Sequence, residues 1–330
     1  MAGNHADRVL EMVASPAAMS QIAVSWRRSF VAHHLQPSNA RKPQRLNESE
    51  MRIACARSDW LMRAAGPVLD RLFRFVDHGG CCVVFTDADG VILDRRGSAG
   101  DDAVFDDWGL WNGAVWSEAQ EGTNGIGTCL FEKRPVTIHR DQHFYARNTA
   151  MSCMDAPVRD HRGRVVGALD VSSCRYDHTE SVAAMTSALV CEAARRLEAD
   201  HFCRTYAAAR ILMTTESCHA GPALLAVDRN DLVIGATHAA RQAYGLDDSS
   251  FESPRPAGDI LGQPETGFAE AERAELRRAL ARTHGNAAAA ARMLGIGRAT
   301  LYRRMERLGI SERKMSAPET RTRAAQLSRR

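Results

Sequence analysis

The segment GNAAAAARMLGIGRATLYRRMERLGI at residues 285–310 decides how the C-terminal part of this chain folds. Asn286 is a favourable N-cap residue, so it predicts the start of an alanine-rich helix, and Gly295 predicts the turn that ends it. The apolar line of this helix is expected at four positions: Ala289, Ala290, Met293 and Leu294. Small side chains on this helix allow the next helix to approach closely across the turn.

A second helix is predicted after the turn, with Leu301, Met305 and Leu308 facing inward. Its outer faces carry five residues that can contact DNA: Arg298, Thr300, Arg303, Arg304 and Arg307. An amphipathic helix precedes the pair and ends at Gly285. The three segments predict an all-α helix-turn-helix at residues 269–310, and the alternative is a packing module with a solvated basic helix.

The distribution of charge favours a nucleic-acid partner for this segment. The net charge of the whole chain is +3, but residues 270–330 hold fifteen Arg or Lys against six Asp or Glu. Basic charge concentrated at one end is typical of a nucleic-acid-binding surface. Residues 311–330, taken alone, are more simply interpreted as a solvated basic tail.

The rest of the chain predicts an α+β fold. Residues 1–78 have apolar residues at helical spacing, and residues 79–176 contain about five short β-type runs, with a hairpin signal at Asp89-Gly90. We therefore expect a sensor-like core, an antiparallel sheet flanked by helices. The sequence shows no signal peptide and no apolar run long enough to span a membrane, which favours a cytoplasmic protein.

Three further segments are predicted between this sheet and the C-terminal helices. Residues 177–218 lack Pro and Gly and have apolar residues at helical intervals, which predicts a long connecting and dimerisation helix. Residues 219–247 predict two short strands around a turn at Asn230-Asp231, followed by a short helix. Residues 248–268 are rich in Pro, Ser, Gly and acidic side chains and predict a flexible linker.

The C-terminal pattern resembles the Fis-type helix-turn-helix of bacterial regulators. The resemblance rests on Gly-Asn, the alanine-rich helix, Leu-Gly-Ile, Arg-x-Thr-Leu-Tyr-Arg-Arg and a second Leu-Gly-Ile. The resemblance implies a homodimer whose recognition helices enter successive major grooves of double-stranded DNA. It implies base contacts by Arg298 and Arg303, and phosphate contacts by Thr300 and Arg304. Gly297 departs from the polar residue that the family often has there, so base preference does not follow from the resemblance.

Residues 45–173 resemble the GAF domain of bacterial regulators of the acetoin-catabolism-activator type. Among the carriers are TNGIGT at 123–128, RPV at 134–136 and GALD at 167–170. Residues 223–246 resemble the opening of the PAS domain of such regulators, cut short. The resemblance implies a sensory cup that holds a small-molecule effector. Six residues are expected near that ligand, with plain core packing as the alternative for the aromatic ones: Trp111, Trp116, His139, Phe144, Met151 and Cys153.

Other chemistry in this region is less favoured by the sequence. Residues 122–124 lack the lysine and the spacing of a phosphate loop. His139, His143 and Cys153 could form a metal site, but this region begins as a strand, so we predict no metal and no cofactor. Cys153 would need a lowered thiol pKa to act as a redox sensor, and Cys129 is the partner to consider for a cysteine-based reductase. We predict that the chain is not an enzyme.

The segment between sensor and helix-turn-helix bears on how the chain acts. The resemblance implies that the full-length relatives carry an AAA+ ATPase there, whereas this sequence contains no GxxxxGKS or GxxxxGKT segment. The sequence therefore predicts a ligand-responsive, sequence-specific transcriptional regulator that acts by occupying DNA, without ATP-driven remodelling of polymerase. Contact with RNA polymerase stays open. The alternative is an architectural Fis-like protein in which the GAF domain serves as a dimer scaffold.

Overall fold

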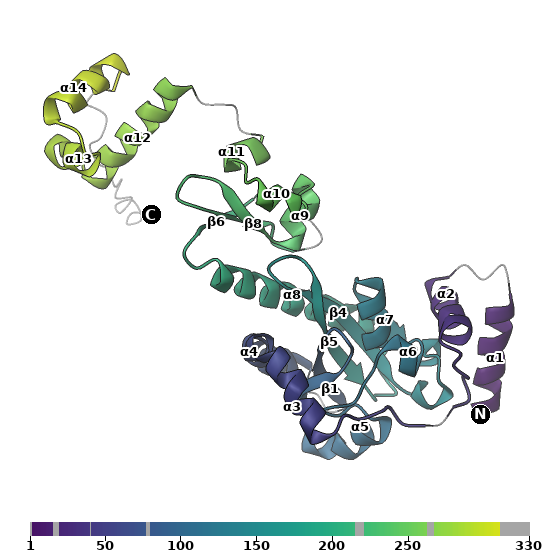
Figure 1. Cartoon of the computed structure of the whole chain (residues 1–330). Helices are drawn as coiled ribbons and strands as arrows, with labels where there is room; N and C mark the ends of the chain where they lie inside the picture. The colour runs from purple at the N-terminus through teal and green to yellow at the C-terminus, as the bar shows by residue number, and fades with distance from the viewer. Residues whose placement is uncertain are drawn as a thin grey trace, which may run out of the picture. The chain divides into compact units, whose positions relative to one another are not determined.

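The computed structural model describes residues 2–15, 20–39, 41–76, 80–214, 221–262 and 267–310 (Figure 1). The chain forms two compact units, Met1–Ala257 and Gly258–Arg330, and each is described by itself. The predicted basic tail at residues 311–330 lies outside the described residues. Among the helices that are described, none has both the length and the apolar character needed to cross a membrane.

A five-stranded sheet forms the centre of the first unit (Figure 1). In spatial order its strands are β2 Ile92–Gly97, β1 Cys81–Thr86, β5 Val165–Ser173, β4 Ser152–Arg159 and β3 Val136–His139. Every neighbouring pair is antiparallel. The antiparallel sheet predicted for residues 79–176 is therefore confirmed. It includes the β1–β2 hairpin, whose turn has Gly90 at a φ of +81°.

Helices cover both faces of this sheet, which explains why its central strands are buried along most of their length. The covering helices are α4 Asp59–Val76, α5 Asp102–Trp108, α7 Gly125–Glu132 and α8 Glu180–Thr205. Val83, Met154 and Val171 belong to the cluster that packs against α4 and α8, here named the α8-side core. Val84 and Cys153 belong to the cluster on the other face, here named the α7-side core. Adjacent residues serve different cores because side chains alternate along a strand.

Most of the described residues before β1 lie in helices, but residues 33–39 and 41–47 do not. The helices before α4 are α1 Ala2–Ala14, α2 Gln21–Arg27, the π-helix η1 Arg28–Ala32 and α3 Glu48–Arg57. Val9 of α1 and Trp26 of α2 are buried against Phe144 and Tyr145, so the first two helices pack on the loop between β3 and β4. The remaining short helices of the sheet region are η2 Ala99–Asp101, α6 Glu118–Glu121, η3 Arg140–Gln142 and η4 Ala146–Asn148.

The long helix predicted at residues 177–218 is shorter in the structure. α8 ends at Thr205, and the chain turns at Tyr206, whose carbonyl accepts from Ala209 N at 2.9 Å. Residues 210–213 then form a strand, β6 Arg210–Met213, because they find a partner strand in β7. The prediction of a continuous helix is therefore wrong beyond residue 205, and residues 215–218 lie outside the described part. One face of α8, including Ala183 and Val190, also fills the α8-side core.

β6 belongs to a second sheet of three antiparallel strands. Its other members are β7 Leu224–Val227 and β8 Val233–Ala236, and α9 His238–Tyr244 follows them. The strands and the short helix predicted around Asn230-Asp231 are confirmed, whereas β6 was not predicted. Phe202 of α8 packs with Leu224 and Ala226 of β7. A single helix thus contributes side chains to the cores of both sheets.

The flexible linker predicted at residues 248–268 is folded over its first part. It contains α10 Ser249–Glu252 and α11 Ala257–Ile260. Val233 N donates to Arg255 O and Ala257 N donates to Asp231 O, each at 2.9 Å. The prediction is wrong there because these backbone hydrogen bonds hold residues 255–257 on the β7–β8 hairpin, which composition alone does not reveal. Residues 263–266 lie outside the described residues.

The second unit is all-α over its described residues, as predicted. Its helices are α12 Phe268–Arg282, α13 Ala287–Met293 and α14 Arg298–Arg307. They share one small apolar core, whose buried members are Leu276, Ala279, Leu280, Ala287, Ala290, Ala291, Leu301 and Met305. Each of the three helices contributes to this core.

Candidate functional site

The sequence singled out Asn286, Gly295 and Gly297, which lie at the start of α13, at its end and at the start of α14. Asn286 Oδ1 accepts from Ala289 N at 3.0 Å and caps α13, an interaction that contributes about 1 kcal/mol to helix stability. Gly295 takes a φ of +66°, which ends α13 and lets the chain reverse. Gly297 is the N-cap of α14 and makes no side-chain cap. The helix-turn-helix geometry is therefore set by one cap and one glycine.

The buried face of α13 differs from the predicted one. Ala287, Ala290 and Ala291 are buried, whereas Met293 is 52% exposed. The expectation that Met293 faces inward is wrong because α14 approaches the alanine side of α13, where no long side chain would fit. On α14, Leu301 and Met305 are buried, as predicted.

The outer face of α14 presents two of the predicted DNA contacts and a third residue that was missed. Arg298 and Arg303 are exposed, and Tyr302 is 37% exposed between them. Arg298 Nη2 lies 3.4 Å from Tyr302 Oη, and its guanidinium lies 5.6 Å from the centre of the tyrosine ring. We name Arg298, Tyr302 and Arg303 the α14 outer surface. The spacing of Tyr302, one turn after Arg298, is the signal that could have identified it.

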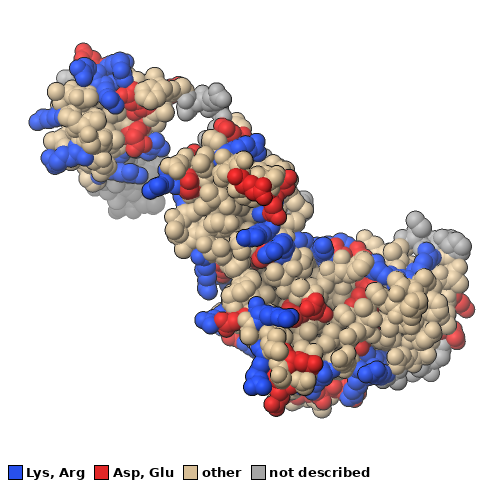
Figure 2. Space-filling view, viewed as in Figure 1, with Lys and Arg blue, Asp and Glu red and all other residues tan. Residues whose placement is uncertain are grey.

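Arg304 and Arg307 have a different environment, because both pair with one carboxylate on α12. Arg304 Nη1 lies 3.1 Å from Glu272 Oε1, and Arg307 Nη2 pairs with Glu272 Oε2. The Glu272 side chain is only 9% exposed, whereas both arginines are partly open to solvent. Figure 2 shows basic side chains exposed over this unit with acidic ones beside them. Thr300 is half-buried. The four predicted arginines therefore form two pairs, one exposed and one held by Glu272, and Thr300 belongs to neither.

Within the first unit, three of the six residues predicted near an effector come together. Trp116, Met151 and Cys153 all belong to the α7-side core. The other three lie elsewhere. Phe144 packs with Trp26 in the N-terminal cluster, Trp111 lies 4.5 Å from the Arg95 guanidinium, and His139 Nδ1 lies 2.9 Å from Ser152 Oγ.

A buried polar chain crosses the α7-side core from Cys153. Its Sγ lies 3.4 Å from His143 Nε2 and 3.2 Å from Ser172 Oγ, and Ser172 Oγ donates to Asp170 Oδ2 at 2.9 Å. His143 Nδ1 lies 2.9 Å from the carbonyl of Arg140, so Nδ1 carries the ring proton and Nε2 accepts. Burial lowers the pKa of His143 to about 4, which keeps the ring neutral. The thiol proton of Cys153 can serve either Nε2 or Ser172 Oγ.

The buried series of polar side chains ends at two carboxyl groups, which the sequence reasoning missed. Asp155 and Asp170 face each other across β4 and β5 and are fully buried. Burial raises the pKa of Asp170 to about 7 and, together with the nearby Asp170 carboxylate, raises the pKa of Asp155 well above its usual value. Asp155 is therefore the carboxyl that holds its proton more tightly, beside Asp170. A Cβ on Gly125 would lie 2.0 Å from Asp155 Oδ2, so glycine is required where α7 begins.

The geometry of the thiols bears on redox and metal chemistry. Cys129 and Cys153 are both buried, and burial raises the thiol pKa of each well above its usual value, which disfavours the reactive thiolate. His139 bonds Ser152, as described, instead of lying with His143 at Cys153. Among the described residues, no three His, Cys, Asp or Glu side chains gather closely enough to hold a metal ion.

With this geometry in place, comparison with known proteins identifies both parts of the chain. Residues 9–191 match the family described as MimR, N-terminal domain. This chain belongs to that family. The MimR N-terminal match runs from α1 into α8 and so contains the five-stranded sheet, the α7-side core and all of the α8-side core except Ala194 and Leu197. Residues 267–311 match the family described as bacterial regulatory protein, Fis family, which confirms the predicted Fis-type helix-turn-helix.

Curated relatives of this MimR-type chain are regulators of transcription. The acetoin catabolism regulatory protein of Cupriavidus necator is 32% identical over 221 residues, which is 66% of this chain and 33% of that protein. The propane 2-monooxygenase operon transcriptional activator MimR of Mycolicibacterium smegmatis is 32% identical over 161 residues, 48% of this chain and 26% of that protein. The chain thus spans a third or less of the length of these relatives.

A third relative has a similar coverage. The acetoin dehydrogenase operon transcriptional activator AcoR of Bacillus subtilis is 28% identical over 152 residues, 46% of this chain and 25% of that protein. Between the two family matches, this MimR-type chain has residues 192–266. Their described part holds the end of α8, the three-stranded sheet and α9 to α11, with no AAA+ domain.

Proposed function

We propose that this chain is a ligand-responsive transcriptional regulator that reads double-stranded DNA with the α14 outer surface. The observation that carries the proposal is the exposure of Arg298, Tyr302 and Arg303 on a helix whose opposite side is locked in a core by Leu301 and Met305. Exposed guanidinium groups on such a helix can bond base edges in the major groove. The Fis-family match and the regulators among the relatives support the same function.

The contacts divide according to how each side chain is held. Arg298 and Arg303 are assigned to bases, because the outer face of α14 is the part that enters a groove. Thr300, Arg304 and Arg307 are assigned to phosphates. The last two are already paired with Glu272, and a phosphate competes for the same charge-assisted hydrogen bonds.

A second copy of the chain is proposed to cover the open side of α4 and α8. The groove between these helices has a volume of about 440 Å³, and Phe75 and Leu189 line it. Both are large apolar side chains that remain exposed, and Met185, one turn before Leu189 on α8, is 72% exposed. Exposed apolar side chains that line one groove indicate an interaction surface, and a homodimer would bury it.

The effector is proposed to be a small molecule that binds at the α7-side core. Trp116, Met151 and Cys153 supply apolar and thiol surface there, and the polar chain from His143 to Asp170 supplies hydrogen-bonding groups. A ligand shifts the regulator only if it binds two states with different affinity. We propose that the output is occupancy of DNA, since the described part of residues 192–266 consists of helices and a small sheet.

The test is DNA binding by the full chain. Fluorescence anisotropy with DNA from upstream of its own gene and with a scrambled duplex, over a series of salt concentrations, measures specific and non-specific affinity. We expect tighter binding to the upstream DNA, and lower affinity for it in Arg303→Ala. Equal affinity for both duplexes at every salt concentration would instead support the architectural alternative.

The dimer and the effector have separate tests. Leu189→Glu, at an exposed residue that lines the groove, should lower the mass found by analytical ultracentrifugation, whereas Tyr176→Glu, at an exposed residue that does not line it, should not. A thermal-shift screen of alcohols, ketones, phenols and short acids should raise the melting temperature for one class, because ligand binding stabilises the folded state. The Cys153→Ser variant should change that response if the α7-side core is the site.

A further inference from the structure

A second cavity in the first unit has a charge that the proposed function does not use. It has a volume of about 440 Å³, a size at which small-molecule sites occur. The end of α7, β4, α8 and α9 supply its walls. Its charged lining residues and its histidine are Lys133, Arg134, Arg159, Arg195, Glu198 and His238, and the thiol of Cys191 also lines it. We name this cavity the basic cleft.

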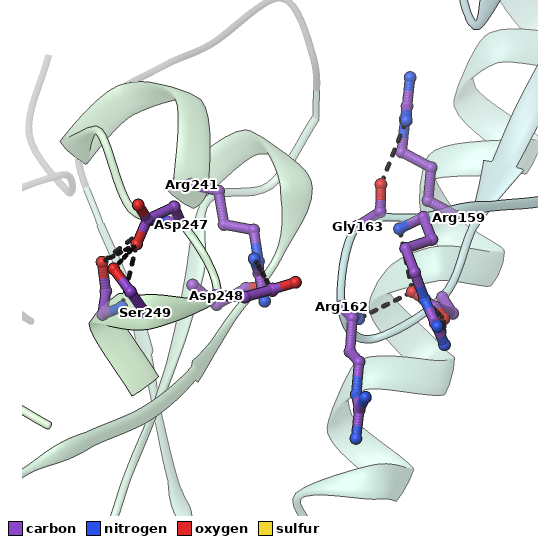
Figure 3. A network of polar contacts seen from close by, with 11 residues as sticks. Arg159, Arg162, Gly163, Arg241, Asp247, Asp248 and Ser249 are labelled. Atoms are coloured by element: carbon purple, nitrogen blue, oxygen red, sulfur yellow. Dashed lines mark hydrogen bonds and ion pairs between the residues drawn. The ribbon is translucent and has the colours of Figure 1, made fainter. Parts of the chain in front are cut away.

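Arg159 lies at the end of β4, and backbone carbonyls hold its guanidinium without any ion pair to a carboxylate among the described residues. Nη1 donates to Gly163 O (Figure 3), at a distance of 3.2 Å. Nη2 donates to Lys133 O at 2.6 Å. Within the described residues, no carboxylate oxygen comes within ion-pair distance of this guanidinium. Burial lowers the pKa of Arg159 from its usual value, and the charge of nearby Glu198 offsets only part of this effect. A half-buried guanidinium with two carbonyl partners has further N–H donors to offer an anion.

The remaining charges leave the basic cleft positive. Glu198 is its only lining carboxylate, and burial raises the pKa of Glu198 to about 7, so its negative charge is incomplete near neutral pH. One of its oxygens, Oε1, accepts from the backbone N of Arg159 at 2.8 Å. Arg134 is partly compensated by Glu132 at 3.5 Å, and Arg195 by Glu192 at 3.8 Å. Lys133 is exposed at the rim and belongs to no ion pair among the described residues.

His238 on α9 experiences the same positive field. Its pKa is lowered to about 4, first by burial and then by the charges of Arg159 and Arg241. Arg241 itself pairs with Asp248 at 2.7 Å, as Figure 3 shows. The imidazole is therefore neutral at physiological pH and can donate or accept a hydrogen bond.

We propose that the basic cleft binds a small anionic metabolite through Arg159, Lys133 and Arg195, at a site separate from the α7-side core. The anionic group, a carboxylate or a phosphate, bonds the free N–H donors of Arg159. Its carbon skeleton contacts Ala156 and Pro157 of β4. Because α9 supplies one wall, the bound ligand contacts both the five-stranded sheet and α9. From α9 the chain continues toward α12.

The test is isothermal titration calorimetry of the full chain with inorganic phosphate and with succinate at physiological salt. Heat with phosphate alone identifies a phosphorylated ligand class, and heat with succinate alone identifies a carboxylate class. Arg159→Gln should weaken binding about tenfold or more, because it removes a charge-assisted hydrogen bond. Arg162→Gln is the matched control, since Arg162 is exposed on the following turn and does not line the cleft.

A second variant guards against misfolding, since Arg159 also holds two backbone carbonyls. If Arg159→Gln melts much earlier than the native chain, the double change Lys133→Gln and Arg195→Gln replaces it, with the same expected loss of affinity. The proposal is overturned if neither probe binds at millimolar concentration. It is equally overturned if the cleft variants and Arg162→Gln bind alike, which would mean an adventitious ion only. DNA binding is not part of this readout, so its failure would leave the cleft result intact.

Discussion

The two units of this chain treat their polar side chains in opposite ways. In the first unit, a series of polar side chains is buried between a sheet and a helix, from His143 through Cys153 and Ser172 to the carboxyl pair. In the second, alanine and leucine fill the core, and the arginines lie at the surface. Burial makes each polar contact costly to disturb, whereas exposure leaves charges available to a partner. A site for a small ligand needs the first arrangement, and a site for DNA needs the second.

The largest expected effect comes from removing the core that supports the α14 outer surface. Leu301→Ala deletes a fully buried side chain, so we expect the second unit to lose about 2–5 kcal/mol of stability and the chain to lose DNA binding. Met293→Ala is the control, because its side chain is half-exposed and should cost little. Helicity and thermal melting of the full chain measure both. Equal losses in the two variants would mean that α13 packs on its methionine side after all.

The next effect tests the buried carboxyl pair through pH. Because the folded-state pKa of Asp170 is raised to about 7, the folded pair holds more protons than the unfolded chain above about pH 4. Its contribution to stability is present at low pH and is lost as pH rises through the folded pKa. The free energy of unfolding should fall by roughly 2–3 kcal/mol from Asp170 alone between about pH 5 and 7, and Asp155, whose pKa is raised in the same direction, adds to this fall.

Asp155→Asn isolates that contribution. Only one carboxyl then remains to be ionised, so the dependence of stability on pH should flatten. Burial also raises the pKa of Glu121 and of Glu198 to about 7. Their contributions to the pH dependence of stability are the same in the native chain and the variant, so they cancel in the comparison. Urea unfolding followed by tryptophan fluorescence gives the curves. Parallel profiles of unfolding free energy against pH for the native chain and the variant would contradict a contribution of Asp155 to the titration of the pair.

A smaller effect separates base contacts from general charge. Arg303→Ala should lower affinity for the specific duplex by about 1–3 kcal/mol and reduce the preference for it over scrambled DNA. Arg278→Ala removes the same charge from α12, where Arg278 pairs with Glu275 at 2.6 Å, and should leave the preference unchanged. Anisotropy with both duplexes distinguishes these outcomes. A loss of preference in both variants would assign specificity to overall charge.

The smallest effect concerns the carboxylate that holds Arg304 and Arg307. Glu272→Gln keeps the shape of the side chain but weakens both ion pairs, so stability should fall by about 0.2–1 kcal/mol. Affinity for scrambled DNA should rise a few-fold, since two guanidinium groups become available to phosphates. If affinity falls for every duplex, Glu272 instead orients these arginines for binding.

The sequence allowed local features to be predicted better than contacts between distant residues. Asn286 and Gly295 act within a few residues of themselves, so the start and end of α13 were predictable. The strands of the main sheet have long apolar runs and clear turns. β6 was missed because Ile211 and Leu212 continue the helical spacing of α8, and only pairing with β7 makes them a strand. The same limit explains the folded part of the linker.

The candidate sites show this limit more sharply. Asp155 and Asp170 lie in separate strands, and nothing local indicates that the sheet sets them opposite each other. Phe144 was placed near the effector from its position in a motif, but α1 and α2 recruit it into another cluster. On α14 the exposed arginines were predicted correctly from helical spacing. The role of Glu272 depends on how α12 crosses α14, which spacing within either helix does not encode.

The continuity of α8 has a mechanical consequence. Its 26 residues form a rod of about 39 Å without a break. Val190 and Leu197 anchor the rod in one core and Phe202 anchors it in the other. A slide or rotation of the rod at its first end must therefore appear at its last turn, because an unbroken helix has no joint at which to absorb the movement. A movement of α8 relative to the five-stranded sheet is therefore transmitted to the three-stranded sheet.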